Sequence, residues 1–169
     1  MNVHVRRADA ADAAALVELA TAVTSEPEGW LLADSNWRSV GDERRYIRAL
    51  RRHPHAALYV AEVDEQLVGR LSLTRDPSPA SGHVADLGLM VAAGHRRRGI
   101  GTALLLTAES WAREAGVSKL ELHVFPHNAP AIALYERVGY VREGLRRDHY
   151  RRPDGRFVDA ILMAKHLAK

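Results

Sequence analysis

A short basic segment followed by two glycines is the first candidate for chemistry. Arg96, Arg97 and Arg98 stand before Gly99 and Gly101, and an apolar run follows. Glycine lets the backbone approach a ligand closely. The first amides of a helix have no intrahelical acceptor, and the helix dipole places partial positive charge there. If a strand precedes this segment and a helix follows it, the geometry is one that binds phosphate.

Other interpretations of this turn remain open. A Walker A loop is excluded, because Gly-Lys-Ser/Thr is absent. The dinucleotide fingerprint lacks its third glycine, since Leu104 stands where it is needed. A solvated turn and a basic nucleic-acid contact are further alternatives. We favour a phosphate lying on the amides of residues 97–102, with the hydroxyl of Thr102 beside it.

Two motifs together resemble one family. Arg96-x-x-Gly99-x-Gly101 resembles the Gln/Arg-x-x-Gly-x-Gly/Ala acetyl-CoA signature of the GCN5-related N-acetyltransferase (GNAT) superfamily. The segment "NAPAIALYERVGY" (128–140) resembles the second motif of that superfamily, with Tyr140 in place of Phe. The resemblance covers nearly the whole chain. It implies acetyl-CoA as co-substrate, no metal, and transfer of an acetyl group to an amine.

The resemblance also implies where the cofactor would bind. Two central parallel strands would splay apart, and main-chain groups of the first would pair with the pantetheine arm. The pyrophosphate would lie on the amides of the glycine turn, and the start of the second motif would contact the cofactor. The expected cofactor-binding residues are Leu89, Met90, Val91, Arg96, Arg97, Arg98, Gly99, Ile100, Gly101, Thr102 and Asn128.

Tyr135 is the expected general acid. It follows Asn128 by seven residues, which is two helical turns, so both lie on one helix face. The matching tyrosine of the family usually protonates the departing thiolate, and a phenol with a pKa of about 10 is protonated at neutral pH. A tyrosine that only packs on the sheet is the alternative. The chain has no cysteine to carry an acyl group, so direct attack of the amine on the thioester is expected.

His123 is the expected general base. The segment 118–125 alternates, with His123 on the face opposite Leu120, Leu122 and Val124. Imidazole titrates near neutrality. A strand histidine that is only hydrogen-bonded to a neighbour is an equal alternative. Glu26, Glu28 and Asp86, directly or through water, are further candidates for the base.

The acceptor is expected between the loop 26–37, the strand 83–91 and the last hairpin. The expected substrate residues are Glu28, Trp30, Asp86 and Tyr150, and Trp37 offers a second apolar wall. The C-terminal segment resembles enzymes that act on free amino acids or small amines and enzymes that act on a ribosomal protein N-terminus. The arginines at 146, 147, 151 and 152 suit an acceptor with a carboxylate, or form a solvated strand face.

The helices and strands expected to position these residues indicate a mixed α/β fold. Periodicity and turn residues predict the order β-α-α-β-β-β-α-β-α-β-β. Splayed central strands are implied by the resemblance. The expected strands cover 2–7, 56–64, 66–75, 83–91 and 118–125, followed by two more around "RRPDG". The expected helices begin near residues 9, 41, 99 and 128.

The length, composition and net charge limit the classes of function that we expect for the chain. A chain of 169 residues with 47% hydrophobic and 27% charged residues predicts a single domain, 1–169, of a globular protein. It shows no membrane span, signal peptide or metal-ligand spacing, and we expect a cytoplasmic enzyme. The net charge of +3 comes from interleaved charges, which ranks a nucleic-acid module behind the enzyme. A non-catalytic CoA-binding sensor or scaffold remains the other alternative. Dimers are common in the superfamily, and the sequence leaves the oligomeric state open.

Overall fold

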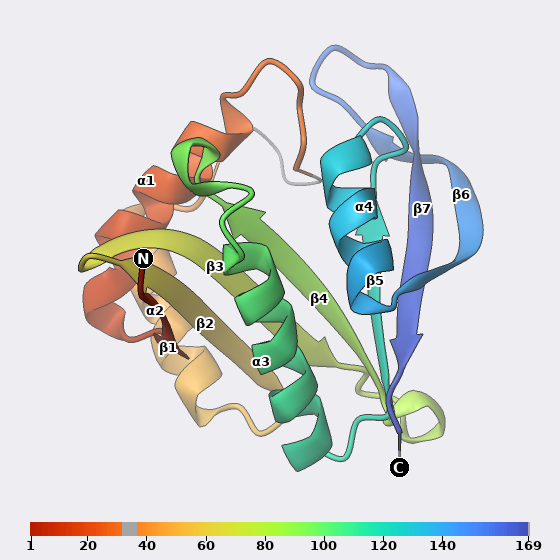
Figure 1. The fold of residues 1–169 in the computed structure, drawn as a ribbon, viewed down its shortest axis with the longest axis horizontal. Coiled ribbons are helices and arrows are strands. Elements are labelled where there is room, and N and C mark those ends of the chain that lie inside the picture. The colour runs from red at the N-terminus through yellow and green to blue at the C-terminus, as the bar shows by residue number, and fades with distance from the viewer. Residues whose placement is uncertain (32–36, 169) are drawn as a thin grey trace.

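The computed structural model describes residues 1–31 and 37–168. The described chain forms one sheet of seven strands with four α-helices, in the order that the sequence predicts (Figure 1). The strands are β1 (Val3–Arg7), β2 (Ala56–Val63), β3 (Gln66–Arg75), β4 (Val84–Val91), β5 (Lys119–Val124), β6 (Val141–Arg151) and β7 (Phe157–His166). The helices are α1 (Ala13–Thr24), α2 (Val40–Arg52), α3 (Ile100–Glu114) and α4 (Ala129–Val138).

The strands lie in the order β1-β2-β3-β4-β5-β7-β6, and β4–β5 is the parallel pair among antiparallel neighbours. That pair is short: residues 84–86 are in register with residues 119–121, and pairing then stops. Beyond this point the two strands separate toward the top of Figure 1. The expected splay of the central strands is therefore confirmed.

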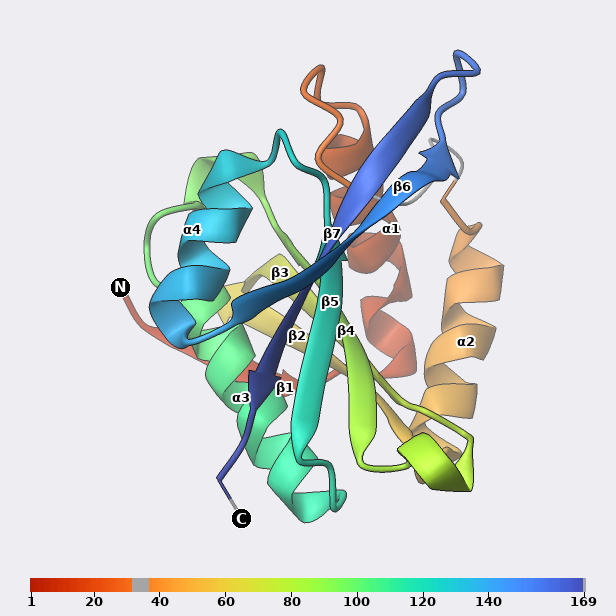
Figure 2. The same cartoon turned by 90° about the vertical axis from the view of Figure 1, so that its right-hand side faces the viewer.

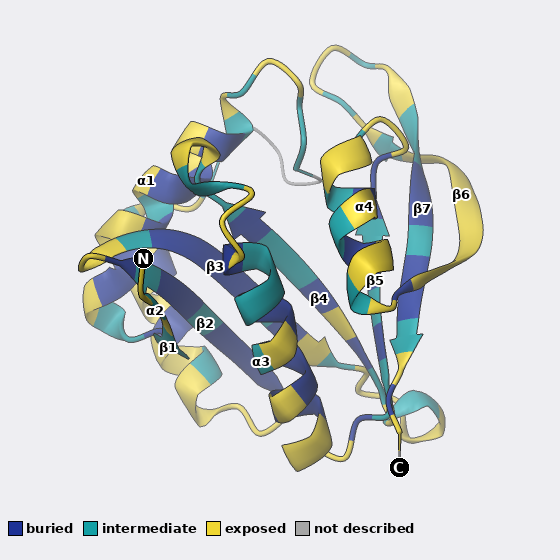
Figure 3. Ribbon diagram, in the orientation of Figure 1, coloured by how far each residue is buried: buried dark blue, intermediate teal, exposed yellow. Residues whose placement is uncertain are grey.

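The helices cover both faces of the sheet. Figure 2 shows α3 and α4 on one side and α1 and α2 on the other. The larger core cluster joins α3 and α4 to the inner strands, and two smaller clusters lie beneath α1 and α2. Figure 3 shows β6, the edge strand, exposed along nearly its whole length. Within the described residues, no helix is both long and apolar enough to cross a membrane.

Local sequence explains the two helices beside the splay. The apolar residues of α3 recur every three or four positions and are buried, since Ile100, Leu104, Ala108 and Trp111 are each 7% exposed or less. The side chain of Asn128 caps α4 by accepting a hydrogen bond from the amide of Ala131 at 3.3 Å. A glycine with φ of +102° then ends α4, as the sequence predicts.

Candidate active site

The start of α3 presents free amides. Gly99 is the N-cap and takes a left-handed backbone with φ of +82°, and Arg97 has φ of +61°. The first helical amide that finds a carbonyl is that of Ala103, which donates to Gly99 at 3.0 Å. In the part of the chain that the structure describes, the amides of residues 100–102 therefore have no backbone acceptor. Free amides and a helix N-terminus together make an anion site.

The edge of β4 presents free backbone groups to the splay. The amide of Ala92 donates to the carbonyl of Val68 on β3 at 2.8 Å. Because backbone groups alternate along a strand, even-numbered residues of β4 face β3 and odd-numbered residues face β5. Pairing with β5 ends at Asp86. Beyond it, Leu89 and Val91 direct their main-chain groups toward the opening, where an extended ligand can pair with the groups of Leu89 and with the amide of Val91. The carbonyl of Val91 already accepts a hydrogen bond from Nε of Arg96.

Met90 is turned away from this opening. Its main chain lies in the hydrogen-bonded register with Arg70 of β3, and its side chain packs beneath α1 among Leu19 and Val23. Leu89, Met90 and Val91 are expected to pair with the pantetheine arm. Because main-chain groups alternate along the strand, Leu89 and Val91 face the opening and Met90 does not.

Arg96 is used inside the protein. Its terminal nitrogens donate to both carboxylate oxygens of Glu26 at 2.7 Å, and its Nε donates to the carbonyl of Val91 at 3.0 Å. The indole of Trp30 donates to the same carboxylate at 3.1 Å. Arg96 therefore ties the loop after α1 to the turn before α3, and Glu26 is committed to this ion pair. Arg97 and Arg98 are exposed at the turn.

Gly101 sets the distance between α3 and α4. A β-carbon at this position would lie 2.6 Å from Cδ2 of Leu134 on α4. The second glycine of the motif thus has a packing reason besides backbone access to a ligand. Thr102, partly exposed one residue further on, lies in the same first turn of α3.

Tyr135 lies on the α3–α4 side of the sheet. Its side chain is 6% exposed and its ring packs 5.9 Å from that of Tyr140. Its hydroxyl forms no hydrogen bond to another described residue. Burial raises the pKa of the Tyr135 phenol well above its ordinary value, so the hydroxyl stays protonated and available as a donor.

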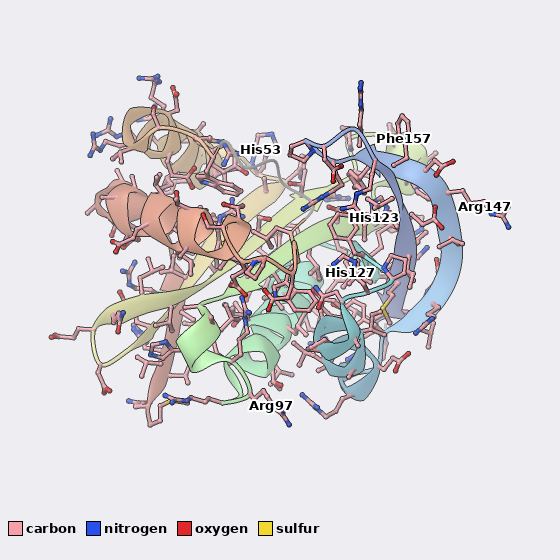
Figure 4. All side chains as sticks on the ribbon, turned by 90° about the horizontal axis from the view of Figure 1, so that it is seen from above. His53, Arg97, His123, His127, Arg147 and Phe157 are labelled. Atoms are coloured by element: carbon pink, nitrogen blue, oxygen red, sulfur yellow. The ribbon has the colours of Figure 1, made fainter. Side chains whose placement is uncertain are left out.

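His123 lies on the opposite face, as the alternation predicts. Its Nδ1 is 3.0 Å from the hydroxyl of Tyr150, and the ring of His149 packs edge-on against both rings. Burial lowers the pKa of His123, and the nearby positive charge of Arg146 lowers it further. Figure 4 shows His123 and His127 inward of the exposed side chains of Arg147 and Phe157, with Arg97 at the side of α3.

Asp86 occupies the same face where the splay begins. It is in register with Glu121 across the parallel pair. Although part of Asp86 is exposed, the protein around its carboxyl and the charge of Glu121 raise its pKa to about 6. Both carboxylates line an open cleft of about 280 Å³, together with Thr74 and Val84.

Aromatic rings link the loop after α1 to the loop between β5 and α4. The ring of His127 stacks on Trp30 at 5.7 Å and on Phe125 at 5.5 Å. His127 Nε2 donates to the main-chain carbonyl of Glu28 at 2.8 Å. Glu28 therefore contributes its backbone to this contact, while the residue itself is exposed. Residues 32–36 of the expected acceptor loop lie outside the described residues.

The arginines of the last hairpin divide into two groups. Arg152 donates to the carbonyl of Leu31 at 3.0 Å and lies over the ring of Phe125 at 5.1 Å, so it closes the hairpin onto the loop after α1. The arginines at 146, 147 and 151 are exposed. These arginines therefore do not form one charged surface: Arg152 makes contacts within the protein, and the other three are exposed to solvent.

Sequence reasoning missed several of these contacts. The pairing of Arg96 with Glu26, the stack on His127 and the packing of His149 beside His123 are absent from the expectations. The strand alternation carries one usable signal, because it places Phe125 on the face of His123. Among the described residues, no group of three or more potential metal ligands comes together.

Comparison with known proteins agrees with this geometry. The sequence model of the Acetyltransferase (GNAT) family matches residues 18–140. L-amino acid N-acetyltransferase AaaT of Escherichia coli K12 is 36% identical over 110 residues, which are 63% of this chain and 65% of that protein. The [Ribosomal protein bS18]-alanine N-acetyltransferase of the same strain is 44% identical over 70 residues, 41% of this chain and 47% of that protein. This chain thus spans about two thirds and about half of the lengths of these two relatives.

A solved structure extends the likeness to the whole fold. The GNAT-family acetyltransferase from Streptococcus pneumoniae superposes with a TM-score of 0.88 over 99% of this chain and 100% of that chain, at 24% identity. The family match covers well over half of the present sequence, including the glycine turn and the start of α4. The chain belongs to the acetyltransferase (GNAT) family.

Proposed function

We propose that this chain is an acetyl-CoA-dependent N-acetyltransferase that passes the acetyl group directly to a primary amine. The candidate acceptors are a small amine, an amino acid or a peptide N-terminus. One observation carries the proposal: the free main-chain groups of β4 and the free amides of α3 face the same opening. A long ligand with an extended amide arm and a phosphate end fits that pair of features.

The residues present fit acetyl-CoA. Leu89 and Val91 would hold the pantetheine arm by their main chain, and the amides of residues 100–102 would hold the pyrophosphate. Bound acetyl-CoA supplies a thioester carbonyl that an amine can attack. Asn128 is occupied as the cap of α4, so its support for the cofactor is the placement of that helix.

The two proposed catalytic residues lie on opposite faces of the sheet. Tyr135 belongs to the α3–α4 side and His123 to the α1–α2 side. The opening between β4 and β5 joins these two faces. A thioester in the opening would therefore have its sulfur near Tyr135 on one side of the sheet. The attacking amine would approach from the other side, near His123.

Each catalytic residue has a proton role that its surroundings support. With the Nδ1 proton of His123 donated to the oxygen of Tyr150, Nε2 is free to accept a proton from the amine. Tyr150 is then a positioning residue for the imidazole. The Tyr135 hydroxyl donates its proton to the departing thiolate, and its raised pKa keeps that proton in place beforehand.

The test is thiol release from acetyl-CoA in the presence of candidate amines, with Tyr135→Phe as the variant. We expect turnover to fall about 10²- to 10⁴-fold, the usual contribution of a positioned acid. Acetyl-CoA affinity should stay within about twofold, because the change keeps the packed ring and the hydroxyl holds no other described residue by a hydrogen bond. Turnover by the variant at the full rate would remove Tyr135 from the mechanism. Binding without turnover on any amine would favour the sensor alternative.

A further inference from the structure

A buried arginine on β3 has no acidic partner. Arg70 is 6% exposed, and its Nε is fully enclosed without a hydrogen-bond partner among the described residues. No described carboxylate lies within ion-pair distance of its guanidinium. A charged group taken out of water in this way is costly unless something else binds it.

The surroundings of Arg70 carry one positive charge too many. Glu43 is fully buried and pairs with Arg38 at 3.1 Å through one oxygen, while its other oxygen has no hydrogen-bond partner in the described part of the chain. The ring of Trp37 is near both arginines, 5.1 Å from Cζ of Arg70 and 5.2 Å from Cζ of Arg38. Tyr46 is the other polar neighbour of Arg70. Among the described residues, two guanidinium groups thus share a single carboxylate.

The register of the sheet places Arg70 next to the splay. It pairs with Met90 on β4, and the next pair on the same face is Ser72 with Gly88. Positions two residues apart on a strand are separated by roughly 6.6 Å. Pairing of β4 with β5 ends at Asp86, so Arg70 lies about two such steps from the start of the opening.

Ser72 occupies the space beside Gly88. A β-carbon on Gly88 would lie 2.8 Å from Oγ of Ser72. Arg70 and Ser72 share one face of β3, where they lie opposite Met90 and Gly88 of β4. In an α-amino acid the amine and the carboxylate are attached to the same carbon, so a carboxylate bound at Arg70 holds the amine close to the guanidinium on this face of the sheet.

We propose that Arg70 binds the carboxylate of the acceptor, which makes free α-amino acids the acceptor class. This inference rests on the proposed function, because it assigns the acceptor side of the same opening. The carboxylate supplies a second anion for the cluster of Arg38, Glu43 and Arg70, which has one carboxylate within the described residues. A peptide N-terminus has no carboxylate at this distance from its amine, so peptides are expected to be poor acceptors.

The test compares each L-amino acid with its own amide, which keeps the amine and side chain and removes the carboxylate charge. Screening the twenty amino acids first identifies the best pair. For Arg70→Gln we expect KM for the acid to rise at least about tenfold, the worth of a charge-assisted hydrogen bond. KM for the amide should be unchanged, and Arg70→Lys should retain part of the preference. Arg44→Gln removes the same charge from an exposed position on α2 and should leave both KM values as they are.

A binding measurement separates this inference from the proposed function. Calorimetric titration of the selected L-amino acid into the complex with CoA should show binding that Arg70→Gln abolishes, whether or not acetyl transfer occurs. The melting temperature of Arg70→Gln without ligand should equal or exceed that of the parent, since the change removes an unpaired buried charge. Equal loss for acid and amide, a fall in melting temperature, or binding of amides and peptides in preference to amino acids would overturn the assignment. Absence of transfer to every amine would overturn the proposed function instead.

Discussion

The ion pair of Arg96 with Glu26 leads to a prediction that distinguishes two roles of Arg96: positioning the turn before α3, and binding phosphate directly. The family motif places Arg96 beside the pyrophosphate, but its guanidinium is held by both oxygens of Glu26 at 2.7 Å. If Arg96 acts by holding the turn before α3, then Arg96→Gln and Glu26→Gln should have the same effect. Both changes remove the ion pair, and Glu26→Gln keeps the shape of its side chain. Arg96→Gln also removes the hydrogen bond of Nε to the carbonyl of Val91.

The expected magnitude follows from the burial of the pair. Hydrogen bonds to charged groups contribute about 1.5–3 kcal/mol when they are well shielded. The side chain of Arg96 is 32% exposed and that of Glu26 is 17% exposed, so part of this is lost to solvent. We therefore expect each variant to lower the free energy of unfolding by about 1–2 kcal/mol. The double variant should lose less than the sum of the two single losses, because the ion pair is counted in both single variants. The separate hydrogen bonds of Arg96 to Val91 and of Trp30 to Glu26 set the remaining difference.

Two measurements check the prediction. Urea unfolding gives the stability of the two single variants and the double variant, and calorimetric titration gives their affinity for CoA at two salt concentrations. Arg98→Gln is the control, since Arg98 is exposed in the same turn and should change the salt dependence of binding without changing stability. The positioning role is refuted if Arg96→Gln weakens CoA binding far more than Glu26→Gln and alone reduces the salt dependence.

Two further predictions concern the base and the helix contact. Burial and Arg146 lower the pKa of His123, so an NMR titration should give a midpoint below the ordinary value of about 6.5. Arg146→Ala should move that midpoint and the acid limb of kcat upward together; a limb that stays in place would exclude His123 as the base. Gly101→Ala should destabilise the protein by about 1–2 kcal/mol in urea unfolding, because its β-carbon would meet Leu134. Leu134→Ala should relieve much of that effect, and strictly additive losses would contradict the contact.

The helices and strands were predicted from local interactions, and their order is confirmed. The helix expected from about residue 99 to 115 runs from Ile100 to Glu114, and the strand expected at 83–91 runs from Val84 to Val91. Apolar periodicity, capping by Asn128 and the glycine that ends α4 each depend on residues within a few positions. Such interactions do not depend on where the segment lies in the fold, so they can be predicted from the sequence.

The site shows the limit of those rules. Glu26 and Arg96 are 70 positions apart in the chain, and nothing near either one indicates their pairing. The direction of the Met90 main chain depends on which strand pairs with β4 on each side. The isolation of Arg70 depends on how α2 and the segment around Trp37 cover the sheet. Each of these is a property of packing between distant segments.

The sequence by itself determined the order of the elements, the glycine turn and, through two motifs in their spacing, the family. These features are encoded by neighbouring residues, because dihedral preference, capping and amphipathic period act over one or two turns. The tertiary structure decided what each charge near the opening does: Arg96 holds the turn, Glu26 is committed to it, and Arg70 has no carboxylate at ion-pair distance among the described residues. Charges act through space, so their partners and their solvent exposure exist only once the chain has folded.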